Sequence, residues 1–232
     1  MTGIARGLGT LLLTLIATAA WTTERGVVVE LFTSQGCSAC PPADELLADL
    51  AEREGVIALA LHVDYWDYIG WKDSFAQPRF TQRQKAYARA NHDRSVFTPQ
   101  IIVGGQDRVM GAKAMKVMDL IAAHAQTPQP VSLSLVRDEG RLTVALSAER
   151  AMGPADVQLV RYRPSSNVHI KRGENAGRTF DYANVVTDWK VLGRWDGQAP
   201  LRLRVEAEGD SPVVVIVQEA GHGRVLAAAR LR

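Results

Sequence analysis

The stretch VVVELFTSQGCSAC, residues 27–40, decides the fold that this sequence predicts. It opens with a β-branched, apolar run that is typical of a buried strand. Cys37 and Cys40 follow, and residues 43–53 then place apolar side chains at helical spacing along one face. A cysteine pair between a strand and the first turn of a helix meets free N–H groups and the positive end of the helix dipole, which stabilise a thiolate. The stretch therefore predicts a strand and a helix joined by a reactive cysteine pair.

Residues 26–126 alternate strand-like and helix-like patterns. Further strands are expected at 56–63, 100–103 and 108–110, and further helices at 75–90 and 114–125. The first helix is expected to turn its acidic residues away from its apolar face: Asp44, Glu45, Asp49 and Glu52. Strands and helices that alternate in this way build a central, partly parallel sheet with helices packed over it. The expected order of elements is β-α-β-α-β-β-α.

Residues 126–130 contain two prolines and are expected to form a linker. After the linker the pattern changes to about eight short strands separated by turn residues, which favours a β-sandwich. Between two of these strands, residues 172–177 form either a tight turn or a loop that reaches the cysteine pair. The sequence therefore predicts two domains, an α/β domain at residues 24–126 and an all-β, sandwich-like domain at residues 131–232.

The N-terminus has the pattern of an export signal. Arg6 precedes an apolar run from Leu8 to Ala20, and Ala17-Thr18-Ala19 fits the small residues of a cleavage site. The run is about 13 residues long, whereas a helix that spans a membrane needs about 20. We therefore expect residues 1–20 to be a signal peptide, and the mature bacterial protein to be periplasmic or secreted, without a stable membrane anchor. An uncleaved anchor or a buried first helix is the alternative.

Composition excludes several classes of protein. The net charge of +2 and the hydrophobic content of 47% are those of an ordinary globular chain, so no nucleic-acid partner is expected. Cys37 and Cys40 are the only cysteines, which excludes a framework of several disulfides or an all-cysteine zinc site. No Walker, dinucleotide-binding or G-x-S-x-G motif is present, and no organic cofactor is expected. The cysteine pair is the expected redox centre, with a structural clip or part of a metal site as alternatives.

The order of elements, the C-x-x-C spacing after the first strand, and Thr98-Pro99 before the third strand resemble the thioredoxin-like superfamily. The resemblance implies a thioredoxin-like fold for residues 24–126 and a cis-proline loop that faces the cysteines and helps to hold the substrate chain. It also implies thiol–disulfide exchange, in which Cys37 attacks and Cys40 resolves the mixed disulfide. The implied partners are protein thiols or disulfides in the periplasm. A trans proline that opens a strand is the alternative for Pro99.

A narrower resemblance covers the whole mature chain. The strings ELFTSQGC at 30–37, HVDYWD at 62–67, GW at 70–71 and GEN at 173–175 resemble an uncharacterised family of secreted bacterial proteins, catalogued as domain of unknown function 1223. This resemblance implies a thioredoxin-like fold and a redox site, but no particular substrate. Pro41-Pro42 departs from ordinary thioredoxins. Because proline is accepted in the first turn of a helix, we expect the helix to begin at one of these prolines and to leave Cys37 in the loop.

Glu30 lies in the otherwise apolar first strand, before Cys37. A buried carboxyl beneath the helix could move protons to and from Cys40. Thioredoxins carry such an acid one residue nearer the cysteine, where this chain has Leu31. An offset of one residue turns a side chain to the other face of a sheet. A surface or salt-bridged glutamate is therefore an equal alternative.

Aromatic residues cluster after the second strand: Tyr65, Trp66, Tyr68, Trp71 and Phe75. Such a segment could cap the active site and bind an unfolded polypeptide, with Tyr65, Trp66 and Trp71 as the substrate-binding residues. Alternatively, these rings pack the two domains together.

His62, at the end of the second strand, supports a second hypothesis for function. With Cys37 and Cys40 it could complete a copper or zinc site, since thiolates and imidazole suit both metals, and the protein would then be a metal-binding chaperone. A satisfied, partly buried histidine is the alternative. A third hypothesis is a non-catalytic interaction module in which the cysteines form a structural disulfide.

Overall fold

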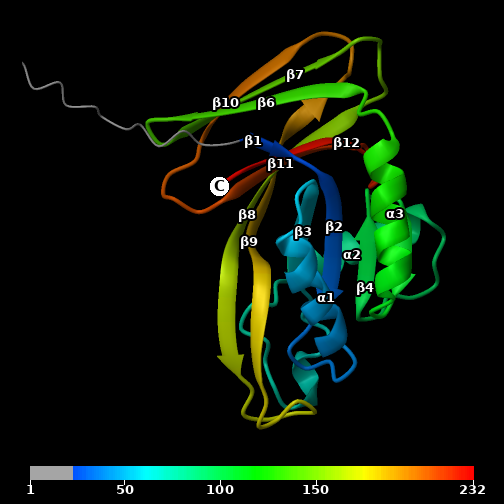
Figure 1. Cartoon of the computed structure of the whole chain (residues 1–232), viewed down its shortest axis with the longest axis vertical. Coiled ribbons are helices and arrows are strands. Elements are labelled where there is room, and N and C mark those ends of the chain that lie inside the picture. Colours follow the sequence, from blue (N-terminus) through cyan, green and yellow to red (C-terminus); the bar gives the residue numbers. More distant parts are fainter. Residues whose placement is uncertain (1–22) are drawn as a thin grey trace, which may run out of the picture.

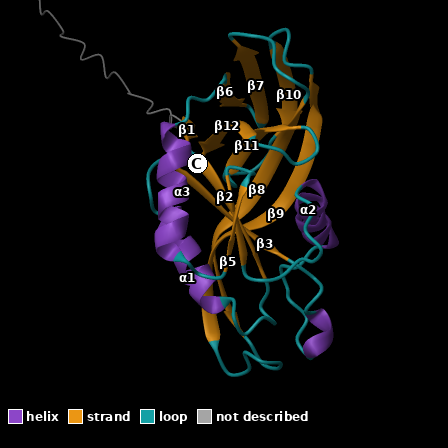
Figure 2. Cartoon of the chain, turned by 90° about the vertical axis from the view of Figure 1, so that its right-hand side faces the viewer, coloured by secondary structure: helices purple, strands orange, loops and turns teal. Residues whose placement is uncertain are grey.

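The computed structural model describes residues 23–232, so the expected signal peptide at residues 1–20 lies outside the described residues (Figures 1 and 2). The helices of the described chain are α1 (Pro41–Ala51), α2 (Pro78–Ala90) and α3 (Ala114–Gln126), with a short 3₁₀-helix, η1 (Asp67–Ile69). The strands are β1 (Thr23–Arg25), β2 (Val27–Thr33), β3 (Val56–His62), β4 (Gln100–Val103), β5 (Asp107–Met110), β6 (Val131–Asp138), β7 (Arg141–Ala148), β8 (Ala155–His169), β9 (Thr179–Trp195), β10 (Leu201–Glu206), β11 (Val213–Glu219) and β12 (Val225–Leu231). From β2 to α3 the strands and α-helices follow the expected order. Within residues 23–232, no helix has the length and apolar character needed to cross a membrane.

One mixed sheet of nine strands runs through the described chain, in the order β1-β12-β11-β8-β9-β3-β2-β4-β5. β2 is parallel to β3 and antiparallel to β4, which is antiparallel to β5. β9 joins the two halves of the chain, because it pairs in parallel with β3 at Val185 and Ala60. The Asn184 side chain supports this junction by donating a hydrogen bond to the Ala58 carbonyl, at 2.9 Å.

The all-β, sandwich-like domain expected at residues 131–232 takes a different form. β8, β9, β11 and β12 extend the nine-stranded sheet, and the other three strands form a separate antiparallel sheet in the order β10-β7-β6. The small sheet packs on strands of the large one through an apolar cluster that includes Leu133, Leu146, Val157 and Val215. The chain is therefore a mixed α/β protein, and one sheet crosses the expected domain boundary near residues 126–131.

The side chains of β2 alternate between the two faces of the sheet. Because both faces are covered, the whole strand is buried. Val29 and Leu31 belong to the apolar cluster that includes residues of α1 and α3. Val28 and Phe32 belong to the cluster on the opposite face, with residues of α2 and of the C-terminal strands. Glu30 lies between these positions in a strand whose seven residues are all buried. By alternation, Glu30 shares the face of Val28 and Phe32.

β8 and β9 form a long hairpin that extends toward the start of α1 (Figure 1). β8 pairs with β11 only from Ala155 to Arg161, and β9 pairs with β3 at Val185, so beyond Val185 the hairpin is a ribbon of two strands. β8 is therefore one long strand, in a part of the chain where the sequence predicts only short ones. Pro164 is tolerated within it because that part of β8 has a free edge. We call residues 170–178, which connect β8 to β9, the hairpin tip.

Candidate functional site

Cys37 and Cys40 form a disulfide at the start of α1, with their Cα atoms 5.4 Å apart. Cys40 is the N-cap residue of α1, and its carbonyl accepts hydrogen bonds from the N–H groups of Ala43 and Asp44, at 2.8 and 3.1 Å. The helix begins at Pro41, as the two prolines predicted, and leaves Cys37 in the preceding loop. The helix dipole therefore acts most directly on Cys40.

Both cysteines are buried. Cys37 is 2% exposed and Cys40 has no exposed surface, whereas Ser38 and Ala39 between them are exposed. We call residues 34–40, which hold the pair, the cysteine loop. A sulfur atom of another protein has little direct access to either cysteine in this arrangement.

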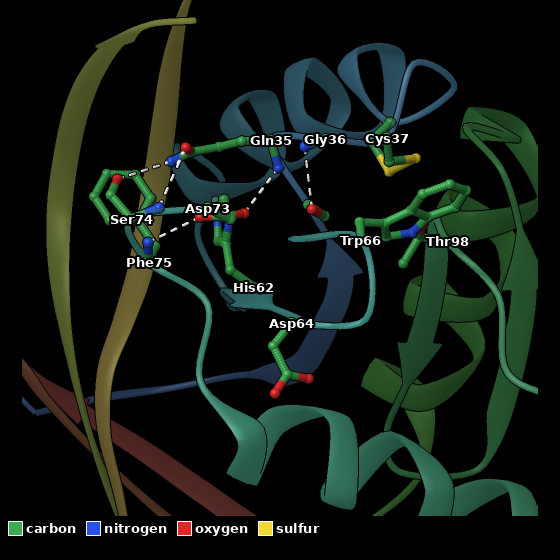
Figure 3. A network of polar contacts seen from close by, with 12 residues as sticks. Gln35, Gly36, Cys37, His62, Asp64, Trp66, Asp73, Ser74, Phe75 and Thr98 are labelled. Carbon is green, nitrogen blue, oxygen red and sulfur yellow. Dashed lines mark hydrogen bonds and ion pairs between the residues drawn. A yellow bond between two sulfur atoms is a disulfide. The ribbon is translucent and has the colours of Figure 1, made fainter. Parts of the chain in front are cut away.

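Trp66 lies beside the disulfide (Figure 3). Its Nε1 donates a hydrogen bond to the hydroxyl of Thr98, at 2.7 Å. The peptide bond between Thr98 and Pro99 is cis, as the resemblance to thioredoxins implies. A Cβ atom at Gly36 would lie 3.3 Å from the Cβ of Trp66, so glycine at this position leaves the room in which Trp66 packs on the cysteine loop. The structure thus brings together four of the candidate residues, Cys37, Cys40, Trp66 and Thr98.

Tyr65 and Trp71, the other aromatic residues expected to bind substrate, have different contacts. The Tyr65 hydroxyl donates to Oε1 of Gln84 on α2, at 3.2 Å. Nε1 of Trp71 donates to Oε1 of Gln35, at 2.8 Å. Both side chains therefore fix the segment after β3, residues 63–77, to the rest of the molecule.

Phe75 fits the alternative interpretation of the aromatic cluster, in which the rings pack the two halves of the chain together. Its ring centroid lies 5.9 Å from that of Tyr182 on β9, in an edge-to-face arrangement. Both rings also contact the imidazole of His62 edge to face, with centroids 5.2 and 5.0 Å away. The hairpin is thus anchored at Tyr182 to the end of β3.

Gln35, which is fully buried, connects the cysteine loop to the segment after β3 (Figure 3). Its backbone N–H donates to Oδ2 of Asp73, at 2.8 Å, and its side-chain amide donates to the hydroxyl of Ser74, at 3.1 Å. Its Oε1 accepts the hydrogen bond from Trp71. Sequence patterns gave no sign of this role, because every partner lies more than 30 residues further along the chain.

Asn175 connects the C-terminal half to the same loop. Its Nδ2 donates hydrogen bonds to the backbone carbonyls of Gln35 and Cys37, at 2.9 and 3.1 Å. Asn175 lies in the hairpin tip and is 2% exposed. Nη1 of Arg178 donates to its Oδ1, at 3.3 Å, and so orients the amide. Of the two interpretations for residues 172–177, the loop that reaches the cysteine pair is the one observed.

Glu30 faces α2, on the opposite side of the sheet from α1. Nε and Nη2 of Arg83 donate to its two carboxylate oxygens, at 2.6 and 2.9 Å, and the Tyr87 hydroxyl donates at 2.6 Å. Leu31, one residue further on, is the side chain that packs on the α1 face. Glu30 is therefore the salt-bridged glutamate of the two alternatives that the sequence left open. This corrects the expectation that it carries protons for Cys40, because the sheet separates its carboxylate from the cysteines.

Two buried ionisable side chains meet at the C-terminal end of β3. Nδ1 of His62 and Oδ2 of Asp73 are 2.7 Å apart, and neither side chain has exposed surface. Burial alone would lower the pKa of His62, but the carboxylates of Asp73 and Asp44 raise it above its ordinary value. Burial alone would raise the pKa of Asp73, but His62 and hydrogen bonds from the backbone N–H groups of Gln35 and Phe75 lower it. The surroundings therefore favour the charged form of this pair.

Asp44 was expected on the polar side of α1, and the structure corrects this expectation. It is 7% exposed and lies one helical turn after Cys40, on the buried side of the helix. Burial raises the pKa of Asp44 to about 7, against the lowering effect of His62. Oδ1 of Asp44 and Nε2 of His62 are buried and have no hydrogen-bond partner among the described residues. The helix pattern missed Asp44 because this side of α1 is covered by β9, which comes from the other half of the chain.

In this structure, His62 and the two cysteines are not arranged as metal ligands. Its Nδ1 pairs with Asp73, and the sulfurs of Cys37 and Cys40 are bonded to each other. In the part of the chain that the structure describes, no group of three or more His, Cys, Asp or Glu residues is arranged to hold a metal ion. Instead, His62 is a buried histidine that is paired with a carboxylate.

Comparisons with known proteins place the chain in a family. Protein AGR_C_4864 from Agrobacterium tumefaciens, known from an X-ray crystal structure, is 33% identical, with a TM-score of 0.76; the match covers 88% of this chain and 93% of that one. HBP35 of Porphyromonas gingivalis is 16% identical, with a TM-score of 0.63 over 89% of this chain and 74% of that one, which shows a similar fold alone. No curated protein matches the chain. The family model described as "Protein of unknown function (DUF1223)" matches residues 28–218, and the chain therefore belongs to the DUF1223 family.

Proposed function

We propose that this protein is an exported thiol–disulfide oxidoreductase whose redox centre is the Cys37–Cys40 disulfide. The observation that carries the proposal is the bonded pair at the start of α1, beside Trp66 and Thr98. The unit β2-α1-β3 followed by β4-β5-α3, with β2 parallel to β3 and antiparallel to β4, supports a thioredoxin-like fold for this part of the chain. The position of the pair at a helix N-terminus supports a stabilised thiolate in the reduced protein.

The exchange needs no cofactor beyond the disulfide itself. A thiolate of a partner protein attacks the Cys37 sulfur, the Cys37–Cys40 bond breaks, and a mixed disulfide forms between Cys37 and the partner. Cys40 leaves as a thiolate and takes up a proton. A second thiolate of the partner then attacks the partner's own sulfur in the mixed disulfide and releases Cys37. The partner has gained a disulfide, and its two electrons are held by the two cysteines; the reverse steps reduce a partner disulfide.

Asp44 is the group best placed to exchange protons with Cys40. Side chains four residues apart on a helix are neighbours, and both of these lie on the buried side of α1. A carboxyl with a pKa of about 7 is present in both protonation states near neutral pH, which is the condition for efficient general acid and base catalysis. Asp44 therefore takes the role that the sequence suggested for Glu30.

The pattern of an export signal at residues 1–20 supports a periplasmic location. Disulfides form and persist in that compartment, which suits a protein that holds its cysteine pair oxidised. Its partners there would be proteins with exposed thiols or disulfides.

A second candidate function is an interaction module with an inert, structural disulfide. The 2% exposure of Cys37 favours this alternative, because exchange requires a partner sulfur to reach it.

The reduction potential of the pair, measured on the protein without residues 1–20 in glutathione buffers, distinguishes the two. The oxidoreductase predicts a value between about −120 and −270 mV, whereas structural disulfides lie below about −300 mV. Cys37→Ser should abolish exchange with a reduced, unfolded polypeptide. Cys40→Ser should accumulate a mixed disulfide when it is mixed with a polypeptide that carries a disulfide: the Cys37 thiolate attacks that bond, one sulfur of the polypeptide leaves as a thiolate, and no Cys40 is present to resolve the product. Full exchange activity in Cys37→Ser would rule out the proposal.

A further inference from the structure

The hairpin tip and the segment after β3 close together over the cysteine loop. A Cβ atom at Gly173 in the tip would lie 3.2 Å from the Cβ of Trp71, so the tip packs closely on this segment. Trp66, from the same segment, packs on Gly36 in the cysteine loop. The result is that Cys37 is 2% exposed, although the proposed exchange requires a partner sulfur to approach it. A protein with this function needs a way to uncover Cys37.

Asn175 is the residue through which the tip holds the cysteine loop. Its side-chain amide donates one hydrogen bond to the carbonyl of Gln35 and one to the carbonyl of Cys37, on either side of Gly36. Both acceptors are backbone oxygens, which accept hydrogen bonds whether the cysteines are oxidised or reduced. These contacts therefore close the site without favouring one redox state.

Most of the tip is exposed: of residues 170–178, only Ile170 and Asn175 are buried, and Gly173 packs on Trp71. After Arg161, β8 no longer pairs with β11, and β9 pairs with β3 at Val185; beyond Val185 the hairpin continues as two strands. Isolated two-stranded ribbons are marginally stable in water, and such regions open locally at a low cost in free energy. Tyr182 anchors the middle of the ribbon against His62. The part that can open is the tip itself, residues 170–178.

We propose that Asn175 is a positioning residue that controls access to Cys37, a proposal that rests on the exchange function proposed above. In the closed state its two hydrogen bonds hold the tip over the cysteine loop. When they break, the tip moves away and a partner thiolate reaches the Cys37 sulfur. A site that is available in only a fraction of the molecules reacts in proportion to that fraction. Asn175 therefore slows reduction and reoxidation by the same factor and leaves the equilibrium between them unchanged.

Removal of the Asn175 amide tests this proposal. The rates of disulfide reduction by reduced glutathione and of reoxidation by oxidised glutathione are measured in wild type, Asn175→Ala and Asn167→Ala, together with the equilibrium constant. Asn167 is a matched control, because it is an exposed asparagine on the same hairpin whose side chain bonds to Asp181, at 2.6 Å. We expect Asn175→Ala to accelerate both reactions about tenfold, the effect of removing two hydrogen bonds, with an unchanged equilibrium constant. Asn167→Ala should react like wild type.

A second variant keeps the test informative if Asn175→Ala folds poorly. Arg178→Ala removes the exposed guanidinium that orients the Asn175 amide, and should accelerate both reactions by a smaller factor. Wild-type rates in both variants would overturn the proposal. Acceleration of one direction alone would also overturn it, since it would mean that Asn175 stabilises one redox state.

Failure of the proposed function gives a different result. In that case Asn175→Ala still reacts faster with glutathione, but neither it nor wild type exchanges with a reduced, unfolded polypeptide. If only the role of Asn175 is wrong, Cys37→Ser and Cys40→Ser behave as the oxidoreductase predicts, while Asn175→Ala reacts at the wild-type rate.

Discussion

Arg83 donates two hydrogen bonds to the carboxylate of Glu30, at 2.6 and 2.9 Å, in the interior between α2 and β2. The guanidinium also lies over the ring of Trp189, with its carbon 3.9 Å from the ring centroid. Oε1 atoms of Gln158 and Gln218 accept further hydrogen bonds from it. Because both charges are fully hydrogen-bonded, the pair can be buried, and it connects α2 to strands of both halves of the chain.

Glu30→Gln is expected to destabilise the protein without affecting the redox site. The substitution leaves the Arg83 charge buried without a counter-ion, so we expect the free energy of unfolding in urea to fall by about 3–5 kcal/mol. The pH profile of disulfide exchange should stay unchanged, because Glu30 faces away from the cysteines. Glu45→Gln, at an exposed acid on α1, is the control and should leave stability unaltered. A changed pH profile in Glu30→Gln would mean that this carboxyl does exchange protons with Cys40.

Asp44→Asn is expected to remove a pH dependence of stability. The pKa of Asp44 is raised from 3.8 to about 7 in the folded protein, so between these pH values the folded state binds more protons than the unfolded state. The wild-type protein therefore loses stability as the pH rises through this window, by about 4 kcal/mol at most. Urea unfolding should be measured at several pH values. The free energy of unfolding of Asp44→Asn, relative to that of wild type, should rise with pH up to about pH 7 and stay constant above it. Asp49→Asn, at an exposed site on the same helix, is the control, and a constant difference across the window would contradict the assignment.

The same substitution is expected to slow exchange. A general acid or base contributes typically about 10²–10⁴-fold, so Asp44→Asn should reduce the rate of reduction by glutathione at about pH 6 by at least 100-fold. The plot of the wild-type rate against pH should change slope near the pKa of Asp44, whereas the plot for the variant should not. Equal rates in the two proteins would mean that Cys40 exchanges its proton with solvent and not with Asp44.

Trp66→Ala is expected to impair exchange with a polypeptide more than exchange with glutathione. The indole lies beside Cys37 and offers apolar surface that a bound chain can cover (Figure 3). We expect the rate ratio of a reduced, unfolded polypeptide to glutathione to fall about tenfold, which corresponds to about 1.4 kcal/mol of apolar contact. Using the ratio cancels any change in access to the disulfide. Tyr65→Phe is the control, and an equal loss for both thiols would argue against a role of Trp66 in substrate binding.

Residues 23–130 alone are not expected to form a stable fold. Val28, Ile57 and Leu59 share an apolar cluster with Val160 and Val214, which the fragment lacks. The exposed face would favour association or a loosely packed state. Circular dichroism should show no cooperative urea transition for the fragment, in contrast to the full chain. A cooperative transition would support an independent domain at residues 24–126.

The local features of the N-terminal half were predictable because they depend on neighbouring residues. The run at β2 and the prolines after Cys40 set a buried strand and a helix start, and both are observed. The glycines after β4, Gly104 and Gly105, turn the chain into β5, and both have positive φ. Such signals need only a few consecutive residues to act.

The features of the fold and of the site that the sequence did not predict depend on contacts between distant segments. The sequence predicts strands after the linker, but nothing in its pattern specifies that one of them, β9, pairs with β3. Once β9 lies there, it covers α1 and buries Asp44, which a helical pattern alone assigns to solvent. Asn175 lies 138 residues from Cys37, and only the tertiary fold brings the two together. Burial of polar groups was therefore the least predictable part of the site.

β1 pairs with β12, and Thr23 lies opposite Leu231. One edge of the nine-stranded sheet thus consists of the first and last strands of the described chain. Pairings between such distant residues form slowly, and this edge cannot form before residue 231 is available. A chain that is exported unfolded would therefore complete its sheet only after residue 231 has crossed the membrane. The hairpin tip also comes late in the chain: until residues 170–178 fold onto the cysteine loop, Cys37 and Cys40 would be open to oxidants, so that the disulfide can form before the tip closes over it.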